Sequence, residues 1–413
     1  MLLGAACNDM PLPGPPPAFA GGGLVASGTP PPSGALKALE GVYATSSLFG
    51  SEVVAHATAT TLSLLATPHA AFAVLHAGCL PPPQAPTLVL EGYWRYLDGR
   101  DTGLVRLFVD PPAAASAVCA GQPVTAPGIT LHGLTGLGAA DPVAPLEAGY
   151  LRPRKQRTGR FLAGGHRGAC QTSAGCAASE NSLETLPLAE QLGADLSEMD
   201  VQVTRDGVPV IYHDGALNGD LSRGLYCFGK ISDLTYAMLL ANCRLLGGEK
   251  IPTLADALEV AGTKTGLAAV WLDIKSPETI PGAVAAIEAF FSRHPSASLQ
   301  VLVGLPSADI IAAYEAAPRS DVVRCLVEED PGDVDRLACT AWGPRFTRGP
   351  MPDVTGRLQS EGRLVVYWTI DDPDLMDAFL TSDTPNGILT SLLPMLVHRF
   401  EAVGRVPGDG VSR

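Results

Sequence analysis

The sequence predicts an α/β protein in which a (β/α)8 barrel follows a small all-β domain. From about residue 160 onward, short apolar strand-like runs alternate with segments of helical periodicity, a pattern typical of a parallel sheet. About eight such pairs occupy roughly 250 residues, the usual size of an eight-stranded parallel barrel. Between residues 35 and 148 the runs are short or alternating and almost free of helical periodicity, which favours a β-sandwich or a small β-barrel.

We expect three segments: residues 1–34, residues 35–148 and residues 149–413. Residues 8–34 are mostly Pro, Gly and Ala with almost no charge, so they bury too little apolar surface to fold alone and predict a tether. In the second segment, TLVLEGYWRYL and LVRLFVDP flank DGRDTG, which predicts a β-hairpin. No motif in this all-β segment indicates a function. Residues 142–157 are expected to link it to the barrel.

Composition narrows the class of protein. The chain has 413 residues, too long for one ordinary domain. It is 46% hydrophobic and 17% charged, which is a globular composition. The formal net charge of −14 argues against nucleic acid as a partner, because phosphate backbones need basic surface. A small anionic substrate stays possible, since local cations can neutralise it.

The cysteines favour an exported protein. Eight of the nine stand beyond the N-terminus, and although eight allow 105 pairings, the most local pairing is Cys79–Cys119, Cys170–Cys176, Cys227–Cys243 and Cys325–Cys339. Free buried thiols in a cytosolic enzyme are the alternative. The ninth, Cys7, follows MLLGAA, which resembles the end of a bacterial lipoprotein signal and predicts lipid attachment and membrane anchoring at Cys7. The match lacks a basic region, and its apolar segment is short.

A pair of carboxylates lies in one apolar run, LSEMDVQV. Glu198 and Asp200 are two residues apart, so on a strand their side chains point to the same face. Adjacent carboxylates repel each other unless a cation or a shared proton lies between them. Oxygen ligands on a rigid element favour a hard divalent cation. The alternative is a solvated polar strand end.

Other polar residues also stand at predicted strand ends. His166 and Arg167 follow FLAGG, and His213 follows VPVIY. Asp273 and Lys275 end the run LAAVWLDIK. Barrel enzymes build their sites at the C-terminal ends of strands, so we expect these side chains to converge. Two histidines beside a carboxylate pair suit paired general acid and base catalysis around a metal.

The motifs together resemble one family. HRG, then EN, then GAD-x-x-E-x-D-V-x-x-T-x-DG-x-P-V-x-x-HD is similar to the glycerophosphodiester phosphodiesterase family, over about residues 160–398. The resemblance implies that Glu198, Asp200 and Asp273 hold Ca²⁺ or Mg²⁺, with Asp273 standing where the family more often has Glu. It also implies that Glu180 lies near the metal or organises the site.

Three further features bear on the resemblance. Trp368 matches a family aromatic near the site, although a core Trp is an equal alternative. Ser391 stands where the family has Asp. The spacer between HRG and EN is longer than usual and holds Cys170 and Cys176, which predicts a stapled lip over the substrate pocket.

The resemblance implies hydrolysis of a glycerophosphodiester or phospholipid headgroup to glycerol 3-phosphate and an alcohol. Arg167, Lys275 and the metal would neutralise the phosphoryl oxygens, while His166 and His213 would transfer protons. Phospholipase D-like toxins that cleave sphingomyelin share the two histidines and the Glu-x-Asp pair, so a lyase that releases a cyclic phosphate is one alternative. The other is a surface lipoprotein that binds headgroups without catalysis.

Overall fold

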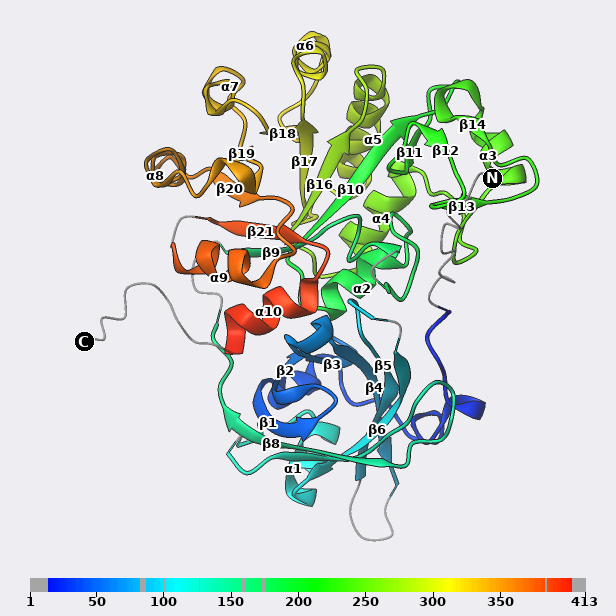
Figure 1. The fold of residues 1–413 in the computed structure, drawn as a ribbon, viewed down its shortest axis with the longest axis vertical. Coiled ribbons are helices and arrows are strands. Elements are labelled where there is room, and N and C mark those ends of the chain that lie inside the picture. The colour runs from blue at the N-terminus through cyan, green and yellow to red at the C-terminus, as the bar shows by residue number, and fades with distance from the viewer. Residues whose placement is uncertain are drawn as a thin grey trace, which may run out of the picture.

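The computed structural model describes residues 14–81, 87–99, 101–125, 127–156, 161–172, 175–382 and 385–402. Cys7 and its predicted lipid attachment lie outside these residues. The chain forms two closed β-barrels, an antiparallel one drawn in blue and cyan and a parallel one ringed by helices (Figure 1). The predicted fold class, an α/β barrel preceded by an all-β portion, is confirmed.

The antiparallel barrel joins eight strands in sequence order, and the last strand pairs back with the first. This closure decides between the sandwich and the barrel in favour of the barrel. The predicted hairpin is confirmed, since β5 and β6 pair from Val89–Phe108 to Arg95–Thr102. The strands are β1 (Gly41–Ser47), β2 (Gly50–Ala57), β3 (Thr61–Leu65), β4 (Phe72–Leu80), β5 (Thr87–Arg95), β6 (Thr102–Asp110), β7 (Thr130–Thr135) and β8 (Ala144–Arg152).

The interior of this barrel is a packed apolar core. Leucines on successive strands, among them Leu64, Leu75 and Leu107, are fully buried together. Two short helices complete the core, η3 (Ala35–Leu39) and α1 (Pro112–Cys119). A filled barrel of this kind leaves little room for a ligand inside it.

Three local expectations were wrong. The stretch 142–157, expected to be a linker, contains β8, because its alternating side chains complete the barrel. Helix α1 was not expected, since its Ala-rich sequence has no clear apolar stripe. Part of the expected tether also packs on the barrel, where Thr29 pairs with Cys79 at the end of β4.

The second barrel is the predicted (β/α)8 barrel. Its eight parallel strands close because β9 pairs with both β10 and β21. A ninth strand, β11 (Pro209–Ile211), lies antiparallel on β10. The parallel strands are β9 (Leu162–Gly165), β10 (Leu196–Val203), β16 (Ala269–Ile274), β17 (Gln300–Leu305), β18 (Arg324–Val327), β19 (Ala341–Trp342), β20 (Leu364–Tyr367) and β21 (Gly387–Thr390).

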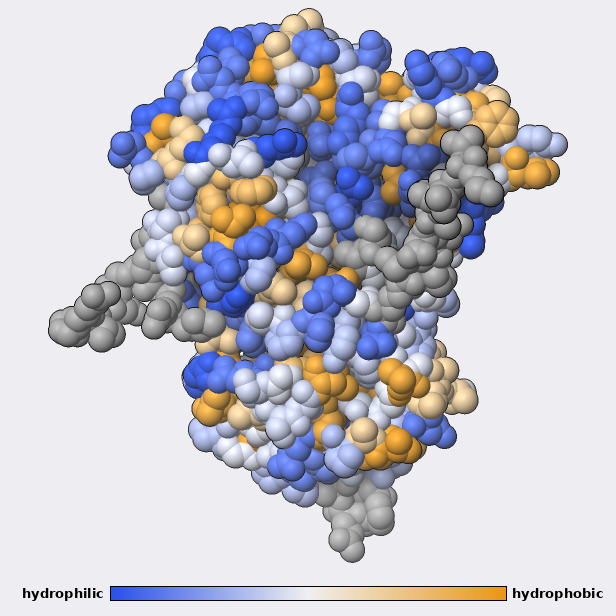
Figure 2. Space-filling view, viewed as in Figure 1, coloured by the Kyte–Doolittle hydropathy of each residue, from blue (hydrophilic) through white to orange (hydrophobic). Residues whose placement is uncertain are grey.

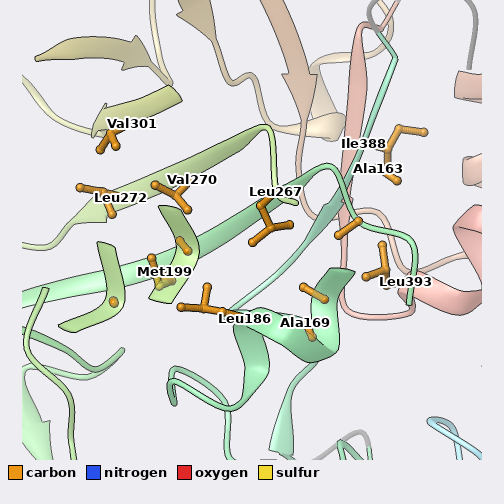
Figure 3. Close-up of a cluster of buried hydrophobic side chains, with 14 of the residues drawn as sticks. Ala163, Ala169, Leu186, Met199, Leu267, Val270, Leu272, Val301, Ile388 and Leu393 are labelled. Carbon is orange, nitrogen blue, oxygen red and sulfur yellow. The ribbon is translucent and has the colours of Figure 1, made fainter. Parts of the chain in front are cut away.

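Apolar strand residues pack against the surrounding helices. Figure 3 shows this layer where Met199, Val270 and Leu272 of the sheet face Leu186 of α2. The continuous apolar runs predicted strands buried on both faces, as observed. The helices are α2 (Thr185–Gln191), α4 (Leu254–Lys264), α5 (Thr279–Arg293), α6 (Ala308–Ala316), α7 (Pro331–Arg336), α8 (Pro352–Ser360), α9 (Pro373–Thr381) and α10 (Leu393–Ala402).

A small lobe, residues 214–250, projects from the mouth of the parallel barrel after β11 (Figure 1). We call it the side lobe. It has its own apolar core, which includes Leu217, Ile231, Leu239 and Leu245. Its elements are β12 (Ala216–Leu217), β13 (Ser222–Arg223), β14 (Gly229–Lys230), η6 (Ile231–Asp233), α3 (Tyr236–Asn242) and β15 (Arg244–Leu245).

Four disulfides staple the chain, and they are the four predicted local pairs: Cys79–Cys119, Cys170–Cys176, Cys227–Cys243 and Cys325–Cys339. Persistent disulfides are typical of exported proteins, so the set points to an exported or extracellular protein. Among the described residues, no helix combines the length and apolar character needed to cross a bilayer.

The two barrels meet through helix α10 and the end of β8. Arg154 bridges them with ion pairs to Glu40 at 2.9 Å and to Glu401 at 3.0 Å. Nearby, Thr67 Oγ1 of the small barrel lies 2.8 Å from Nδ1 of the buried His398 on α10. The interface therefore buries a titratable ring.

The burial of the His398 ring predicts that the free energy of unfolding falls in acid. Burial lowers the pKa of His398 from 6.5 to about 4, so between these pH values the unfolded chain binds a proton that the folded chain does not. The free energy of unfolding should fall by about 2 kcal/mol from pH 7 to pH 5 through this group alone. Denaturant unfolding at both pH values measures it. His398→Gln should remove this share of the pH dependence, whereas His76→Gln, at an exposed position on β4, should retain it. Equal slopes in all three proteins would contradict the assignment.

Candidate active site

The predicted polar residues converge at the C-terminal ends of the parallel strands. They surround a cavity of about 340 Å³. The register of β10 against β16 places Asp200 directly beside Asp273, and the two-residue spacing puts Glu198 on the same face as Asp200. The predicted residues that line the cavity are His166, Arg167, Glu198, Asp200, His213, Asp273, Lys275 and Trp368. Glu180 lies behind Arg167 and does not line it.

Three carboxylates form the floor of the site. One oxygen each from Glu198, Asp200 and Asp273 lies within 4.8 Å of the others. Lys275 Nζ contacts Asp200 Oδ1 at 2.7 Å and Asp273 Oδ2 at 2.6 Å. The other oxygen of Asp200 accepts a 2.7 Å hydrogen bond from Asn181 Nδ2. Asp200 is therefore fixed from both sides.

Burial and the neighbouring charges shift the pKa values of these carboxyls in different directions. Burial, reinforced by Asp200 and Asp273, raises the pKa of Glu198 well above its usual value. For Asp200, burial is outweighed mainly by Lys275, and the pKa is lowered. Burial also opposes the charge of Lys275, but Asp200, Asp273 and Glu198 together raise its pKa. Burial also raises the pKa of Asp273, but Asp273 contacts Lys275 directly, so Glu198 is the less compensated of the two carboxyls.

The carboxylates fit a hard divalent cation. Glu198 Oε1 is buried and has no hydrogen-bond partner among the described residues, and a buried polar atom of that kind calls for a ligand. Three converging carboxylate oxygens are the donors that Ca²⁺ and Mg²⁺ prefer. Glu198, Asp200 and Asp273 are the residues that would hold it.

Arg167 is held rigidly over this floor. Its backbone N–H donates to Glu198 Oε2 at 2.8 Å, and its Nη1 donates to Glu180 Oε1 at 2.6 Å. The other oxygen of Glu180 accepts from the backbone N–H of Thr172 at 3.0 Å. Arg167 adopts a left-handed φ of 52°, which a non-glycine residue keeps only when its surroundings enforce it. Of the two predicted positions for Glu180, the observed one is that of an organiser of the site.

Each histidine is anchored through Nδ1. His166 Nδ1 lies 3.0 Å from Ser391 Oγ, and its Nε2 lies 3.9 Å from Glu198 Oε2. His213 Nδ1 lies 2.5 Å from Asp214 Oδ1. Burial, aided by the positive charge of Arg167, lowers the pKa of His166 to about 3, so its ring is neutral. Ser391, where the sequence departs from the family pattern, is therefore a direct neighbour of His166.

Two charged residues of the cavity were missed by the sequence analysis. Glu328 follows β18 and is buried, with burial and Asp273 raising its pKa. Arg345 lies with Cζ 4.9 Å from the ring centroid of Trp368, whose Nε1 donates to Gly343 O at 2.7 Å. Glu328 stands directly after an apolar run, so the sequence could have indicated that it lies at a strand end. Arg345 follows a strand of only two residues, which is too short to give such a pattern.

The small barrel also contacts the spacer between HRG and EN. Arg95, at the end of β5, is buried and donates from Nη1 to Cys176 O at 2.8 Å and to Gly175 O at 3.3 Å. Cys170 and Cys176 are both buried. Their disulfide segment thus lies against the small barrel, while Gln171 Nε2 of the same spacer lies 3.4 Å from His166 Nδ1 in the cavity. The lip over the pocket stays a prediction. Sequence reasoning missed Arg95, because its partners belong to the other barrel.

A parallel barrel with paired histidines, cations and carboxylates at its strand ends defines the class of phosphoric diester hydrolases. Comparison with known families makes the assignment specific. Residues 166–390, more than half of the chain, match the glycerophosphoryl diester phosphodiesterase family. The chain belongs to this family, and it is an enzyme of that class.

Several relatives carry the same family name. A probable glycerophosphodiester phosphodiesterase 2 from Mycobacterium tuberculosis is 28% identical over 256 residues, which are 56% of this chain and 88% of the relative. A glycerophosphodiester phosphodiesterase from Caldanaerobacter subterraneus is 35% identical over 219 residues, 51% of this chain and 88% of the relative. These relatives support hydrolysis of glycerophosphodiesters.

Two solved structures are similar to part of the chain. A glycerophosphodiester phosphodiesterase from Parabacteroides distasonis has a TM-score of 0.45 at 23% identity, covering 58% of this chain and 97% of that chain. An Oleispira antarctica phosphodiesterase in complex with the product sn-glycerol-3-phosphate has a TM-score of 0.46 at 21% identity, covering 57% and 94%.

Proposed function

We propose that the protein hydrolyses glycerophosphodiesters to glycerol 3-phosphate and an alcohol, with a divalent metal and two histidines that act as general acid and base. The observation that carries this proposal is the joint placement of His166, His213 and the three-carboxylate cluster around one cavity. Conversion to a cyclic phosphate and binding without turnover are the competing functions.

Cations would hold the phosphate. Arg167 is fixed by Glu180, and Lys275 by Asp200 and Asp273, so both present charge to the cavity without reorganisation, which is what transition-state stabilisation requires. A bound Ca²⁺ or Mg²⁺ would supply further neutralisation of the phosphoryl oxygens. Lys275 remains paired with two carboxylates and would therefore orient them as well.

Proton transfer would fall to the Nε2 atoms. Ser391 contacts Nδ1 of His166, and Asp214 contacts Nδ1 of His213, so each ring is oriented by one nitrogen and can exchange protons through the other. His166 is held neutral by burial and suits the role of base toward the attacking hydroxyl. His213 would then protonate the departing alcohol.

Product analysis tests this function. Purified protein is incubated with a panel of glycerophosphodiesters, and ³¹P spectra follow free glycerol 3-phosphate and any cyclic phosphate. We expect glycerol 3-phosphate to be the final product. A cyclic phosphate that accumulates without opening would establish the lyase, and no turnover of any substrate, with retained binding, would establish the headgroup-binding protein.

Metal removal should abolish turnover. Dialysis against a chelator withdraws the cation that compensates Glu198, and Ca²⁺ or Mg²⁺ added back should restore activity because both prefer oxygen ligands. Turnover is measured before dialysis, after it and after titration with each metal. Full activity after exhaustive chelation would contradict a metal-dependent reaction.

We also propose that the protein is exported and anchored to a membrane through a lipid on Cys7. The four disulfides support export, and the sequence around Cys7 supports lipid attachment. Anchoring would keep the enzyme close to the lipids from which its substrates derive.

A further inference from the structure

The side lobe exposes a run of large apolar side chains. Leu225 is 84% exposed, Phe228 66% and Tyr226 64%. Figure 2 shows hydrophobic residues gathered on the outer part of this lobe, at the upper right. Single exposed apolar residues are ordinary, but adjacent ones on a projecting loop mark an interaction surface.

The fold of the loop keeps these side chains outside. Cys227 is bonded to the buried Cys243, so it turns inward while its neighbours Tyr226 and Phe228 face solvent. At Gly224 a Cβ atom would lie 1.8 Å from the carbonyl oxygen of Asn242, so the base of the loop is tightly packed. The apolar tip therefore cannot collapse onto the lobe core.

The charge of the loop differs from that of the whole chain. Between the exposed Asp220 and Asp233, the loop contains two cations, Arg223 and Lys230, and no carboxylate, although the protein carries a net charge of −14. Both cations are exposed. Aromatic and aliphatic side chains flanked by Lys and Arg are the combination that enters the boundary between headgroups and acyl chains.

The lobe is linked directly to a catalytic residue. Asp214, which contacts His213, accepts a 2.5 Å hydrogen bond from Asn218 Nδ2 of the lobe. The lobe that carries the loop is therefore attached to the strand end that holds His213.

We propose that the loop from Arg223 to Lys230 docks onto a phospholipid bilayer. Leu225, Tyr226 and Phe228 enter the headgroup boundary, and the two cations pair with lipid phosphates. The docking itself is independent of catalysis, and its use, delivery of lipid-derived phosphodiesters to the cavity, rests on the proposed function.

Vesicle binding tests the proposal. The full chain with Cys7→Ser, which removes any acyl contribution, is sedimented with vesicles of phosphatidylcholine and phosphatidylglycerol in equal parts. We expect Leu225→Ser, Tyr226→Ser and Phe228→Ser together to weaken partitioning by at least about tenfold, since each side chain loses apolar burial. Arg223→Gln with Lys230→Gln should weaken binding and reduce its dependence on salt.

A matched control separates the loop from general surface apolarity. Leu137 and Val143 of the small barrel are similarly exposed, at 67% and 78%, and Leu137→Ser with Val143→Ser should leave binding unchanged. Turnover of a soluble glycerophosphodiester should be the same in all variants, so a failed docking result is distinct from a failed catalytic one. Absence of vesicle binding, or equal binding by the triple variant, would overturn the proposal. The proposal would also be overturned if the protein self-associated as its concentration rose and only the triple variant lost this behaviour, because the loop would then bind a second copy of the chain.

Discussion

Replacement of either cavity histidine with alanine should lower turnover by on the order of 10²–10⁴, the usual contribution of a positioned proton-transfer group. His166 and His213 end different strands and share one cavity, so each is available for one of the two proton transfers. Binding of a non-hydrolysable phosphodiester should change little, because the proposed phosphate contacts are those of Arg167, Lys275 and the metal. Steady-state kinetics and calorimetric titration measure the two effects separately.

The double variant and a third histidine complete the test. The combined loss should be much smaller than the product of the single losses, because groups that act as a unit are non-additive. His294 belongs to the same barrel but pairs with Glu259 outside the cavity, so His294→Ala should retain turnover. Near-full turnover in both single variants would make the two cavity histidines structural, and the proposed acid and base catalysis would fail.

The carboxylate floor was predictable because its geometry is local. Residues two positions apart on one strand must share a face, and the C-terminal ends of parallel neighbours meet at one edge of the sheet. Glu198, Asp200 and Asp273 therefore converge whatever fills the rest of the barrel. The local disulfide pairs were predictable for a similar reason: cysteines close in sequence need little chain closure to meet.

The remaining features depend on contacts between distant segments. Closure of the small barrel requires β1 to pair with β8, and no local pattern distinguishes that pairing from a sandwich. Arg95 lies at the end of an ordinary strand, and only the docking of the two barrels brings it to the carbonyl oxygens of Gly175 and Cys176. The exposure of the side-lobe loop could not be predicted either, because LYCF is apolar throughout. Only the disulfide to Cys243 shows that Cys227 turns inward while its apolar neighbours stay exposed.

Glu198→Gln should have opposite effects on metal response and on metal-free stability. In the metal-free protein, burial and the neighbouring carboxylates raise the pKa of Glu198, so this side chain lowers the free energy of unfolding at neutral pH, an effect that is absent at pH values below its unfolded pKa. The amide removes that effect, and we expect the metal-free variant to be more stable than the parent protein at pH 7. The same change removes a charged ligand, so turnover should fall with metal affinity.

Thermal and denaturant unfolding with and without metal distinguish these effects. At a metal concentration about 100 times the dissociation constant, the parent protein should gain about 2.7 kcal/mol. Changes to residues that only support a metal ligand weaken metal affinity by up to roughly 100-fold, so loss of a ligand itself should weaken it at least as much. At the same metal concentration, the metal should then stabilise the variant by only about 0.4 kcal/mol. Glu190→Gln alters a half-buried carboxyl remote from the cavity, whose pKa is also raised by burial, and should keep the full metal response. A variant that is less stable without metal yet equally stabilised by it would mean that Glu198 supports the fold and does not bind the cation.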